Sequence, residues 1–470
     1  MKTATESPQL AGCEEILEDR ELTVSPGDYS LLTDLYQLTM AACYAGEGLD
    51  DRPASFELFA RRLPSGFGYA IAMGLAQVLD YLEKFRFSAG QIQALQSTGI
   101  FAGAPERFWT LLAAARFTGD VWAVPEGTAV FANEPLLRIE APLWQAQLVE
   151  TYLLNAINYQ TLIATRAARL RDVAGPEAKL LEFGTRRAFG PQAAVWAARA
   201  ALAAGFDGTS NVLAALKLGR QPVGTIAHAL VMAVSALEGS EDEAFAAFHR
   251  YFPGAPLLID TYDTVAAARM LASRVNSGEM PLQGVRLDSG DLAALSKEVR
   301  SILPGVPIIA SGDLDDREIA KLKSAGACID GYGLGTKLVS GSPVNGVYKL
   351  VEIDGIPVMK EASGKVTYPG RKQIFRTVKD GEIISDCLGL TGEENHNFAS
   401  RIPLMQLVVK EGKQVQEPES LEAIAKRTAA AVASLPAQTR QLNNPISPPV
   451  EISTDLQILT QKTQKTQKSH

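Results

Sequence analysis

The chain has 470 residues, of which 46% are hydrophobic and 21% are charged, and its formal net charge is −8 at pH 7. This is the composition of a globular protein with a large core, long enough for two domains or for one barrel with additions. The negative charge argues against a nucleic-acid-binding protein.

The four cysteines form no CxxC pair, and four histidines give no zinc-type cluster. The first residues lack the apolar stretch of a signal peptide, and no run of uncharged apolar residues is long enough to span a membrane. We therefore expect a cytoplasmic protein with reduced thiols.

The N-terminal part of the chain mixes helical and strand patterns. Residues 1–28 are polar and acidic, which suggests a loose leader. Apolar spacing predicts a helix at 31–43, and alternation predicts a strand at 54–60. With further β-rich patterns at 117–139, these elements predict an N-terminal α+β domain over residues 29–141.

A long helical pattern follows Pro142, and then about seven short strands alternate with helices. The strand patterns end in polar or glycine-containing turns and lie at residues 179–183, 206–210, 224–228, 257–260, 284–288, 307–313 and 329–336. Strands that alternate with helices form parallel sheets. We expect an α/β barrel over residues 142–345 with its site at the C-terminal rim, and a doubly wound open sheet is the alternative.

The C-terminal part returns to antiparallel patterns. Alternating residues at 347–353 and 373–378 predict strands, and we expect the segment 346–435 to return to the N-terminal domain. Residues 436–470 are poor in packing side chains and end in a repeated Gln-Lys-Thr pattern. This composition predicts a disordered tail.

The most informative stretch is GVRLDSGD at residues 284–291. A short apolar strand leads into Arg286 and Asp288, and a helical pattern opens at Leu292. Charged side chains so close to a core strand are costly unless they are paired or bind a ligand. An internal Arg286–Asp288 ion pair is one explanation, and a ligand site at the end of the strand is the other.

The other strand ends carry side chains suited to anions. Arg186, like Arg286, can bind a planar carboxylate or a phosphate through two hydrogen bonds. Asp260 and Asp288 can hold Mg²⁺ or ribose hydroxyls, or can simply cap turns. The remaining candidates at these ends are Asp207, His228, Ser311, Gly312, Gly333, Gly335 and Thr336.

Two of these candidates, the 333–336 run and His228, also have an explanation that involves no function. The Gly-Leu-Gly-Thr run at 333–336 lets backbone N–H groups approach a phosphate, although the motif alone is weak. A lone histidine such as His228 is more often a satisfied core residue, but acids and arginines at the same rim favour a functional role. The pattern predicts an anion-binding barrel enzyme, with magnesium plausible, and does not identify the reaction.

The chain also resembles the nicotinate phosphoribosyltransferase family over about residues 29–412. The motifs that carry the resemblance occur in order at residues 32–36 (LTDLY), 56–64 (FELFARRLP), 182–186 (EFGTR), 224–228 (GTIAH), 259–263 (IDTYD), 285–291 (VRLDSGD) and 332–336 (YGLGT). The resemblance implies an irregular seven-stranded α/β barrel with a smaller α+β domain built from both chain ends.

The same resemblance implies a reaction. Phosphoribose would pass from 5-phosphoribosyl 1-pyrophosphate to nicotinate, with ATP as co-substrate and Mg²⁺ as cofactor. Nicotinate mononucleotide and pyrophosphate would be formed for NAD biosynthesis. His228 looks like a histidine that ATP phosphorylates, although Ala229 follows it where many members have serine.

Further roles follow from the resemblance. Thr225 and Arg286 look like nicotinate contacts, and Phe183 looks like one of two aromatic residues that sandwich the pyridine ring. Tyr36 would be the second, contributed by the partner subunit of a homodimer. Contacts to ribose, pyrophosphate, phosphate or magnesium would come from Arg186, Asp260, Asp288, Ser311, Gly312, Gly333, Gly335 and Thr336.

Three rival functions remain. A nicotinamide phosphoribosyltransferase would share most of these motifs. A non-catalytic sensor of nucleotides or phosphoribosyl pyrophosphate would bind without turnover. An aldolase-like barrel is poorly supported, because Lys337 is the only lysine at a predicted strand end and Schiff-base chemistry needs such a lysine.

Overall fold

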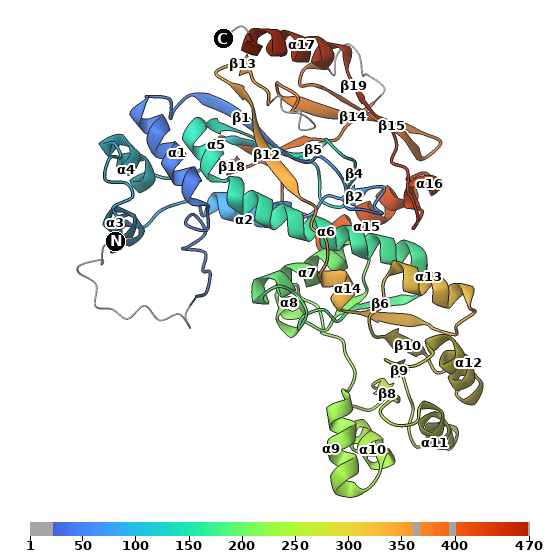
Figure 1. Cartoon of the computed structure of the whole chain (residues 1–470). Helices are drawn as coiled ribbons and strands as arrows, with labels where there is room; N and C mark the ends of the chain where they lie inside the picture. The colour runs from blue at the N-terminus through green and yellow to red at the C-terminus, as the bar shows by residue number, and fades with distance from the viewer. Residues whose placement is uncertain (1–21, 361–366, 394–400, 469–470) are drawn as a thin grey trace, which may run out of the picture.

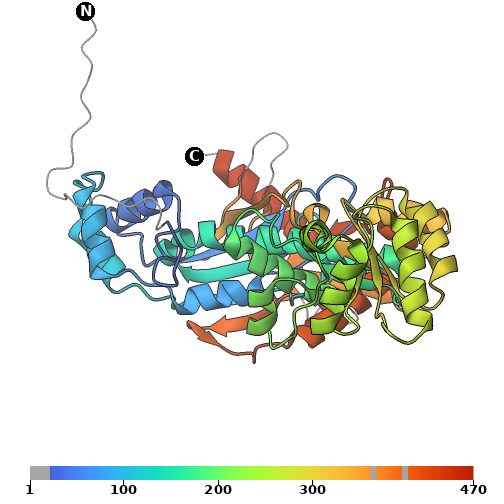
Figure 2. The same ribbon diagram turned by 90° about the horizontal axis from the view of Figure 1, so that it is seen from below.

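The computed structural model describes residues 22–360, 367–393 and 401–468, so most of the predicted leader lies outside the described residues. The chain forms an elongated mixed α/β molecule (Figures 1 and 2). The long helix α6 (Glu150–Ala174) runs between two parts. Antiparallel strands from both chain ends lie on one side of α6, and a parallel sheet with its helices lies on the other (Figure 1).

The largest sheet has seven strands in the order β13-β12-β1-β5-β3-β17-β18. Within this sheet, β1 (Pro53–Ala60) pairs antiparallel with β5 (Pro135–Pro142) and with β12 (Gly346–Ile353). From the C-terminal end, β17 (Gln406–Lys410) pairs with β3 (Asp120–Ala123). The two ends of the chain thus build one sheet. Its edge strands are β13 (Ile356–Pro357) and β18 (Lys413–Gln414).

Five helices accompany this sheet: α1 (Leu35–Gly46), α2 (Leu75–Glu83), α3 (Ala89–Ser97), α4 (Glu106–Ala113) and α5 (Leu143–Leu148). Helix α3 begins with a capping box, in which Ser88 and Gln91 satisfy each other's backbone N–H groups. Phe56 and Leu58 of β1 are buried in the core that these helices share with the sheet. A two-stranded ribbon of β2 (Ala70–Ile71) and β4 (Ala129–Val130) adjoins α6.

A four-stranded sheet includes part of the segment that we expected to be disordered. Strands β14 (Lys372–Lys379) and β15 (Glu382–Leu390) form an antiparallel pair, and β19 (Val450–Ile452) pairs parallel with β15. The fourth strand is β16 (Ile402–Pro403). Helices α15 (Leu421–Ala433), α16 (Ala437–Arg440) and α17 (Thr454–Lys468) belong to the same end of the chain.

The prediction of a disordered tail is therefore wrong for residues 437–468. Leu456 of α17 is fully buried, and Ser453 before it donates a hydrogen bond to Glu393. A segment with few apolar residues can still be ordered when those few enter an existing core and its backbone extends an existing sheet.

The parallel sheet has six strands in the order β7-β6-β11-β10-β9-β8. They are short: β6 (Lys179–Glu182), β7 (Gly208–Thr209), β8 (Leu257–Leu258), β9 (Val285–Leu287), β10 (Ile308–Ser311) and β11 (Gly331–Leu334). The expected strand at residues 224–228 is absent from the described residues. The segment contains Gly224 and follows Pro222, and both residue types weaken a strand. Strands β7 and β8 therefore remain edges, and the sheet is not closed by hydrogen bonds into a seven-stranded barrel.

Two separate cores support this sheet. One lies between α6, α7 (Pro191–Ala203), α13 (Asp316–Ser324) and the strands β6 and β11. The other joins β8 and β9 to α9 (His228–Glu238), α10 (Glu241–Tyr251), α11 (Thr264–Asn276) and α12 (Leu292–Ile302). Helices α8 (Val212–Lys217) and α14 (Thr336–Val339) complete this part. None of the described helices has the length and apolar character that a membrane crossing requires.

Candidate functional site

A cavity of about 730 Å³ opens at the carboxyl ends of β6, β9, β10 and β11. It brings together most of the residues singled out from the sequence. These are Phe183, Arg186, Thr225, Arg286, Asp288, Ser311, Gly312, Gly333, Gly335 and Thr336. Residues from turns more than a hundred positions apart thus share one site, as expected for parallel strands whose carboxyl ends meet at one edge.

Arg286 is a partly buried cation that lines the cavity. Its Nη1 donates to the hydroxyl of Thr225 at 2.6 Å, and its Nε is buried without a hydrogen-bond partner among the described residues. Burial lowers the pKa of Arg286, whereas the charges of Asp288 and Asp260 act in the opposite direction. Both Arg286 and Asp288 are described, and no direct ion pair joins them. The guanidinium therefore keeps binding capacity for an anion in the cavity.

Asp260 and Asp288 are linked through the turn after β9. Asp260 Oδ2 accepts from the Asp288 backbone N–H at 2.8 Å and from the Ser289 hydroxyl at 2.7 Å. Asp288 in turn accepts a hydrogen bond from Ser311. Asp260 Oδ1 is buried and has no hydrogen-bond partner within the described chain. One oxygen of Asp260 thus caps a turn, and the other remains available.

His228 begins α9 at the edge of the cavity. Its Nδ1 lies 3.1 Å from the hydroxyl of Thr261, and its Nε2 lies 4.0 Å from Asp260 Oδ1. The side chain is 40% exposed, so it is not a core histidine. His228 and Asp260 are neighbours of the cavity rather than part of its lining.

Glycines allow the aromatic and phosphate-facing parts of the site to approach closely. A Cβ on Gly333 would lie 2.5 Å from Cε2 of Phe183, so the ring rests directly on the β11 backbone. Gly312 has a φ of +93°, and a Cβ there would lie 2.3 Å from the Asp288 carbonyl oxygen. Larger residues at either position would displace the turns that line the cavity.

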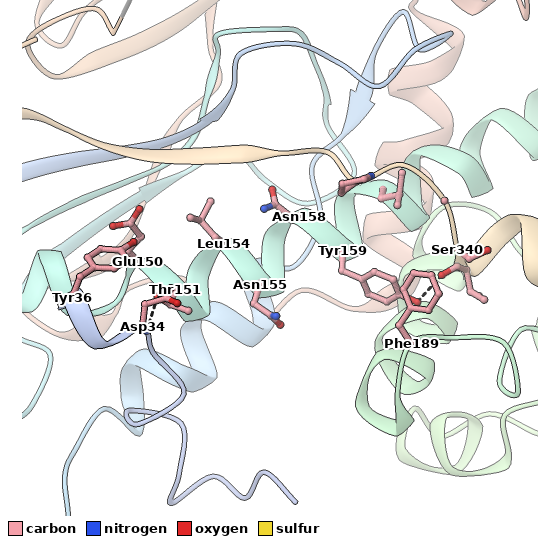
Figure 3. Close-up of a pocket in the computed structure, with 14 residues that line it drawn as sticks. Asp34, Tyr36, Glu150, Thr151, Leu154, Asn155, Asn158, Tyr159, Phe189 and Ser340 are labelled. Atoms are coloured by element: carbon pink, nitrogen blue, oxygen red, sulfur yellow. Dashed lines mark hydrogen bonds between the residues drawn. The ribbon is translucent and has the colours of Figure 1, made fainter. Parts of the chain in front are cut away.

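Tyr36 lies in a different cavity of about 390 Å³, which it shares with Glu150, Thr151 and Phe189 (Figure 3). Its side chain is 48% exposed. Burial of the remainder raises the pKa of Tyr36, and the charges of Glu150 and Asp34 add to this effect. A single chain therefore does not bring Tyr36 to Phe183.

The sequence did not indicate some residues of the cavity lining, and one of its candidates, Asp207, lies outside the cavity. The cavity is also lined by Thr185, Arg187, Ser210, Ile226 and Asp313. Most stand in or beside the turns that the sequence indicated, so their positions after predicted strands could have identified them. Asp207 precedes β7 and forms an ion pair with Arg171 at 2.6 Å, which makes it a structural residue.

Three family models match the chain: the nicotinate phosphoribosyltransferase N-terminal domain at residues 31–158, the family itself at 178–309 and the C-terminal domain at 395–460. A nicotinate phosphoribosyltransferase of Mycobacterium tuberculosis is 42% identical over 90% of this chain and 91% of its own length. That of Bacillus subtilis is 44% identical over 76% and 75%. The crystal structure of the human nicotinic acid phosphoribosyltransferase superposes with a TM-score of 0.80 at 31% identity, covering 92% of this chain and 99% of that one.

Proposed function

Because the chain belongs to the nicotinate phosphoribosyltransferase family, we propose that its cavity transfers the phosphoribosyl group of 5-phosphoribosyl 1-pyrophosphate to nicotinate, yielding nicotinate mononucleotide and pyrophosphate for NAD biosynthesis. The observation that carries this proposal is Arg286. A partly buried guanidinium that, among the described residues, donates only to the Thr225 hydroxyl suits the carboxylate of nicotinate.

The surrounding residues support roles in the same reaction. Phe183 offers a ring face on which the pyridine can stack, which would orient its nitrogen for attack on the ribose carbon. Gly333, Gly335 and Thr336 offer backbone groups and a hydroxyl for a phosphate, and Ser311, Gly312 and Arg186 lie at the same cavity. Positive groups here would stabilise charge on the departing pyrophosphate.

Asp260 and Asp288 are the residues that would hold magnesium. Asp260 Oδ1 is a buried acceptor without a hydrogen-bond partner among the described residues, and Asp288 lines the cavity. Within the described chain, no three His, Cys, Asp or Glu residues are grouped to hold a metal ion. That fits Mg²⁺, which commonly uses one or two carboxylates together with substrate phosphates. A bound Mg²⁺ would neutralise phosphate charge during transfer.

We further propose that ATP phosphorylates His228. A ring nitrogen would attack the γ-phosphorus, the bond to the ADP oxygen would break, and later hydrolysis would release phosphate. The exposed ring beside Asp260 at the cavity edge supports this role. Wild-type protein given γ-labelled ATP should take up acid-labile, base-stable label, and His228→Ala should lose both the label and the ATP stimulation. Label on His228→Ala, or ATP stimulation without any label on wild type, would contradict it.

The remaining proposal is a homodimer with shared sites. Tyr36 is half exposed and lines a different cavity from Phe183, and the exposed side chains of Leu32 and Phe189 line the Tyr36 cavity and the one adjoining it. Tyr36→Ala and Asp288→Ala proteins should each be nearly inactive, and a mixture should regain activity as hybrid dimers form. No recovery despite subunit exchange, shown by mass, would reject shared sites.

The deciding experiment measures pyrophosphate release from phosphoribosyl pyrophosphate with nicotinate or nicotinamide. We expect turnover with nicotinate and little with nicotinamide, because the neutral amide leaves Arg286 without a counter-charge. Preference for nicotinamide would indicate a nicotinamide phosphoribosyltransferase. Binding of phosphoribosyl pyrophosphate without turnover would indicate a sensor.

A further inference from the structure

Glu182 is a buried carboxylate that the reaction described above does not use. It ends β6 and is fully buried, and it does not line the cavity. No lysine, arginine or histidine of the described residues forms an ion pair with it. Its two oxygens instead accept from the backbone N–H of Gly184 and the hydroxyl of Thr209. Burial raises the pKa of Glu182, whereas these two hydrogen bonds lower it.

The first hydrogen bond fixes the turn that follows β6. This turn carries Phe183, Arg186 and two more residues of the cavity wall. It fits closely around Glu182, since a Cβ on Gly184 would lie 2.8 Å from Oε1 of Glu182 and 2.3 Å from Cγ1 of Val339. Phe183 is also held by its N–H, which donates to the Leu334 carbonyl at 2.8 Å. The carboxylate thus fixes the base of one wall.

The second hydrogen bond fixes the turn that follows β7. Thr209 is 1% exposed, and its hydroxyl also accepts from the Asn211 N–H at 2.9 Å. The N–H of Ser210, a residue of the cavity lining, donates to the Glu182 carbonyl at 2.9 Å. The Thr209 carbonyl then accepts from Val223 at 2.9 Å, directly before the cavity-lining segment 224–227. Through Thr209, Glu182 therefore also holds the cavity wall formed by Ser210 and the segment 224–227.

We propose that Glu182, acting through Gly184 and Thr209, is a positioning residue that sets the spacing of the two cavity walls that enclose the substrates. The inference rests on the proposed phosphoribosyl transfer. Displacement of either wall would move Phe183, or the Thr225 that contacts Arg286, away from the substrates, and small misplacements of binding groups weaken binding and catalysis strongly.

The test compares two substitutions of Thr209. Thr209→Val keeps the shape and removes the hydroxyl, whereas Thr209→Ser keeps the hydroxyl. We expect Thr209→Val to raise the KM for nicotinate by about fivefold, the effect of one net hydrogen bond, with a smaller change in kcat. Thr209→Ser should stay near wild type because it keeps both hydrogen bonds. Glu182→Met, which keeps a similar side-chain length but offers no strong hydrogen-bond acceptor, should raise the KM for nicotinate at least as much as Thr209→Val, and it carries the same prediction if Thr209→Val does not fold.

Thr428→Val provides a matched control. Thr428 is another buried threonine, whose hydroxyl donates to the Ala203 carbonyl at 2.9 Å, and it does not line the cavity. This variant should lose stability without a change in KM. If Thr428→Val changed the KM as much as Thr209→Val does, or if kcat fell with an unchanged KM in Thr209→Val and Glu182→Met, the inference would be overturned. Inactive wild-type protein would instead reject the proposed function, so the two failures are distinguishable.

Discussion

Two arginines, one buried in the four-stranded sheet and one partly buried in the cavity, show that charge is compensated differently in two regions of this molecule. Arg376 of β14 donates to both oxygens of Asp386, at 2.9 and 2.6 Å, and to the Ala129 carbonyl at 2.8 Å. Arg286 of β9 donates only to the Thr225 hydroxyl and keeps a buried Nε without a partner among the described residues.

This difference separates a structural charge from a binding charge. Arg376 is compensated within the chain, so its removal leaves Asp386 as a buried, unpaired carboxylate. Arg286 is incompletely compensated, so its remaining capacity is available to a ligand. The first arginine should therefore affect stability most, and the second should affect substrate binding most.

Arg376→Ala should give the largest effect. Breaking a buried ion pair costs about 3–5 kcal/mol because it strands the other charge, and Asp386 is fully buried. Equilibrium urea unfolding compares this variant with Arg286→Ala. If Arg376→Ala costs no more stability than Arg286→Ala, the distinction between the two regions fails.

Leu456→Ala tests whether the C-terminal helix α17 contributes to the stability of the fold through packing. Leu456 of α17 is fully buried, so its truncation should cost about 3 kcal/mol. Ile458→Ala on the same helix is the control, because Ile458 is 45% exposed and should change stability little. Equal, small losses from urea unfolding would show that the tail does not pack in solution.

Arg286→Ala tests the cavity side of the comparison. Loss of a charged hydrogen bond worth about 1.5–3 kcal/mol should raise the KM for nicotinate by about tenfold or more. The KM for phosphoribosyl pyrophosphate should change less, and the melting temperature should fall less than in Arg376→Ala. An unchanged nicotinate KM in the folded variant would remove Arg286 from the nicotinate site.

The smallest effect should be the change in the free energy of unfolding with pH that Glu134 causes. Burial raises the pKa of Glu134 well above its ordinary value of 4.5, the charge of Asp386 adds to this, and Arg376 opposes it. The folded protein then holds a proton that the unfolded chain releases above pH 4.5. The contribution of this proton to the free energy of unfolding is fully present below that pH. It is lost as the pH rises through the folded pKa, by at most about 1.4 kcal/mol per pH unit.

Glu134→Gln measures this contribution, because the amide cannot titrate. Urea unfolding at a series of pH values should show a flatter fall in stability for the variant than for wild type on the alkaline side of the ordinary Glu range. Parallel curves would show that Glu134 is ionised in the folded protein, contrary to its buried position beside Asp386.

Local sequence features were sufficient to identify the family and most of the cavity lining. Arg286 and Asp288 stand two positions apart at the end of an apolar run, and the turns at 183–186 and 333–336 carry their own signals. Such features are local, because the residues after a strand stay together however the strands are arranged. The parallel arrangement then brings these turns to one edge of the sheet.

The hydrogen-bond partners of these groups, and the order of the C-terminal segment, become visible only in the folded protein. Glu182 accepts a hydrogen bond from a hydroxyl 27 residues away, one oxygen of Asp260 has no hydrogen-bond partner among the described residues, and the segment at 224–228 forms no strand. Leu456 is buried although its neighbours predict disorder. Pairing and burial depend on contacts between distant segments, so composition and periodicity along the chain do not specify them.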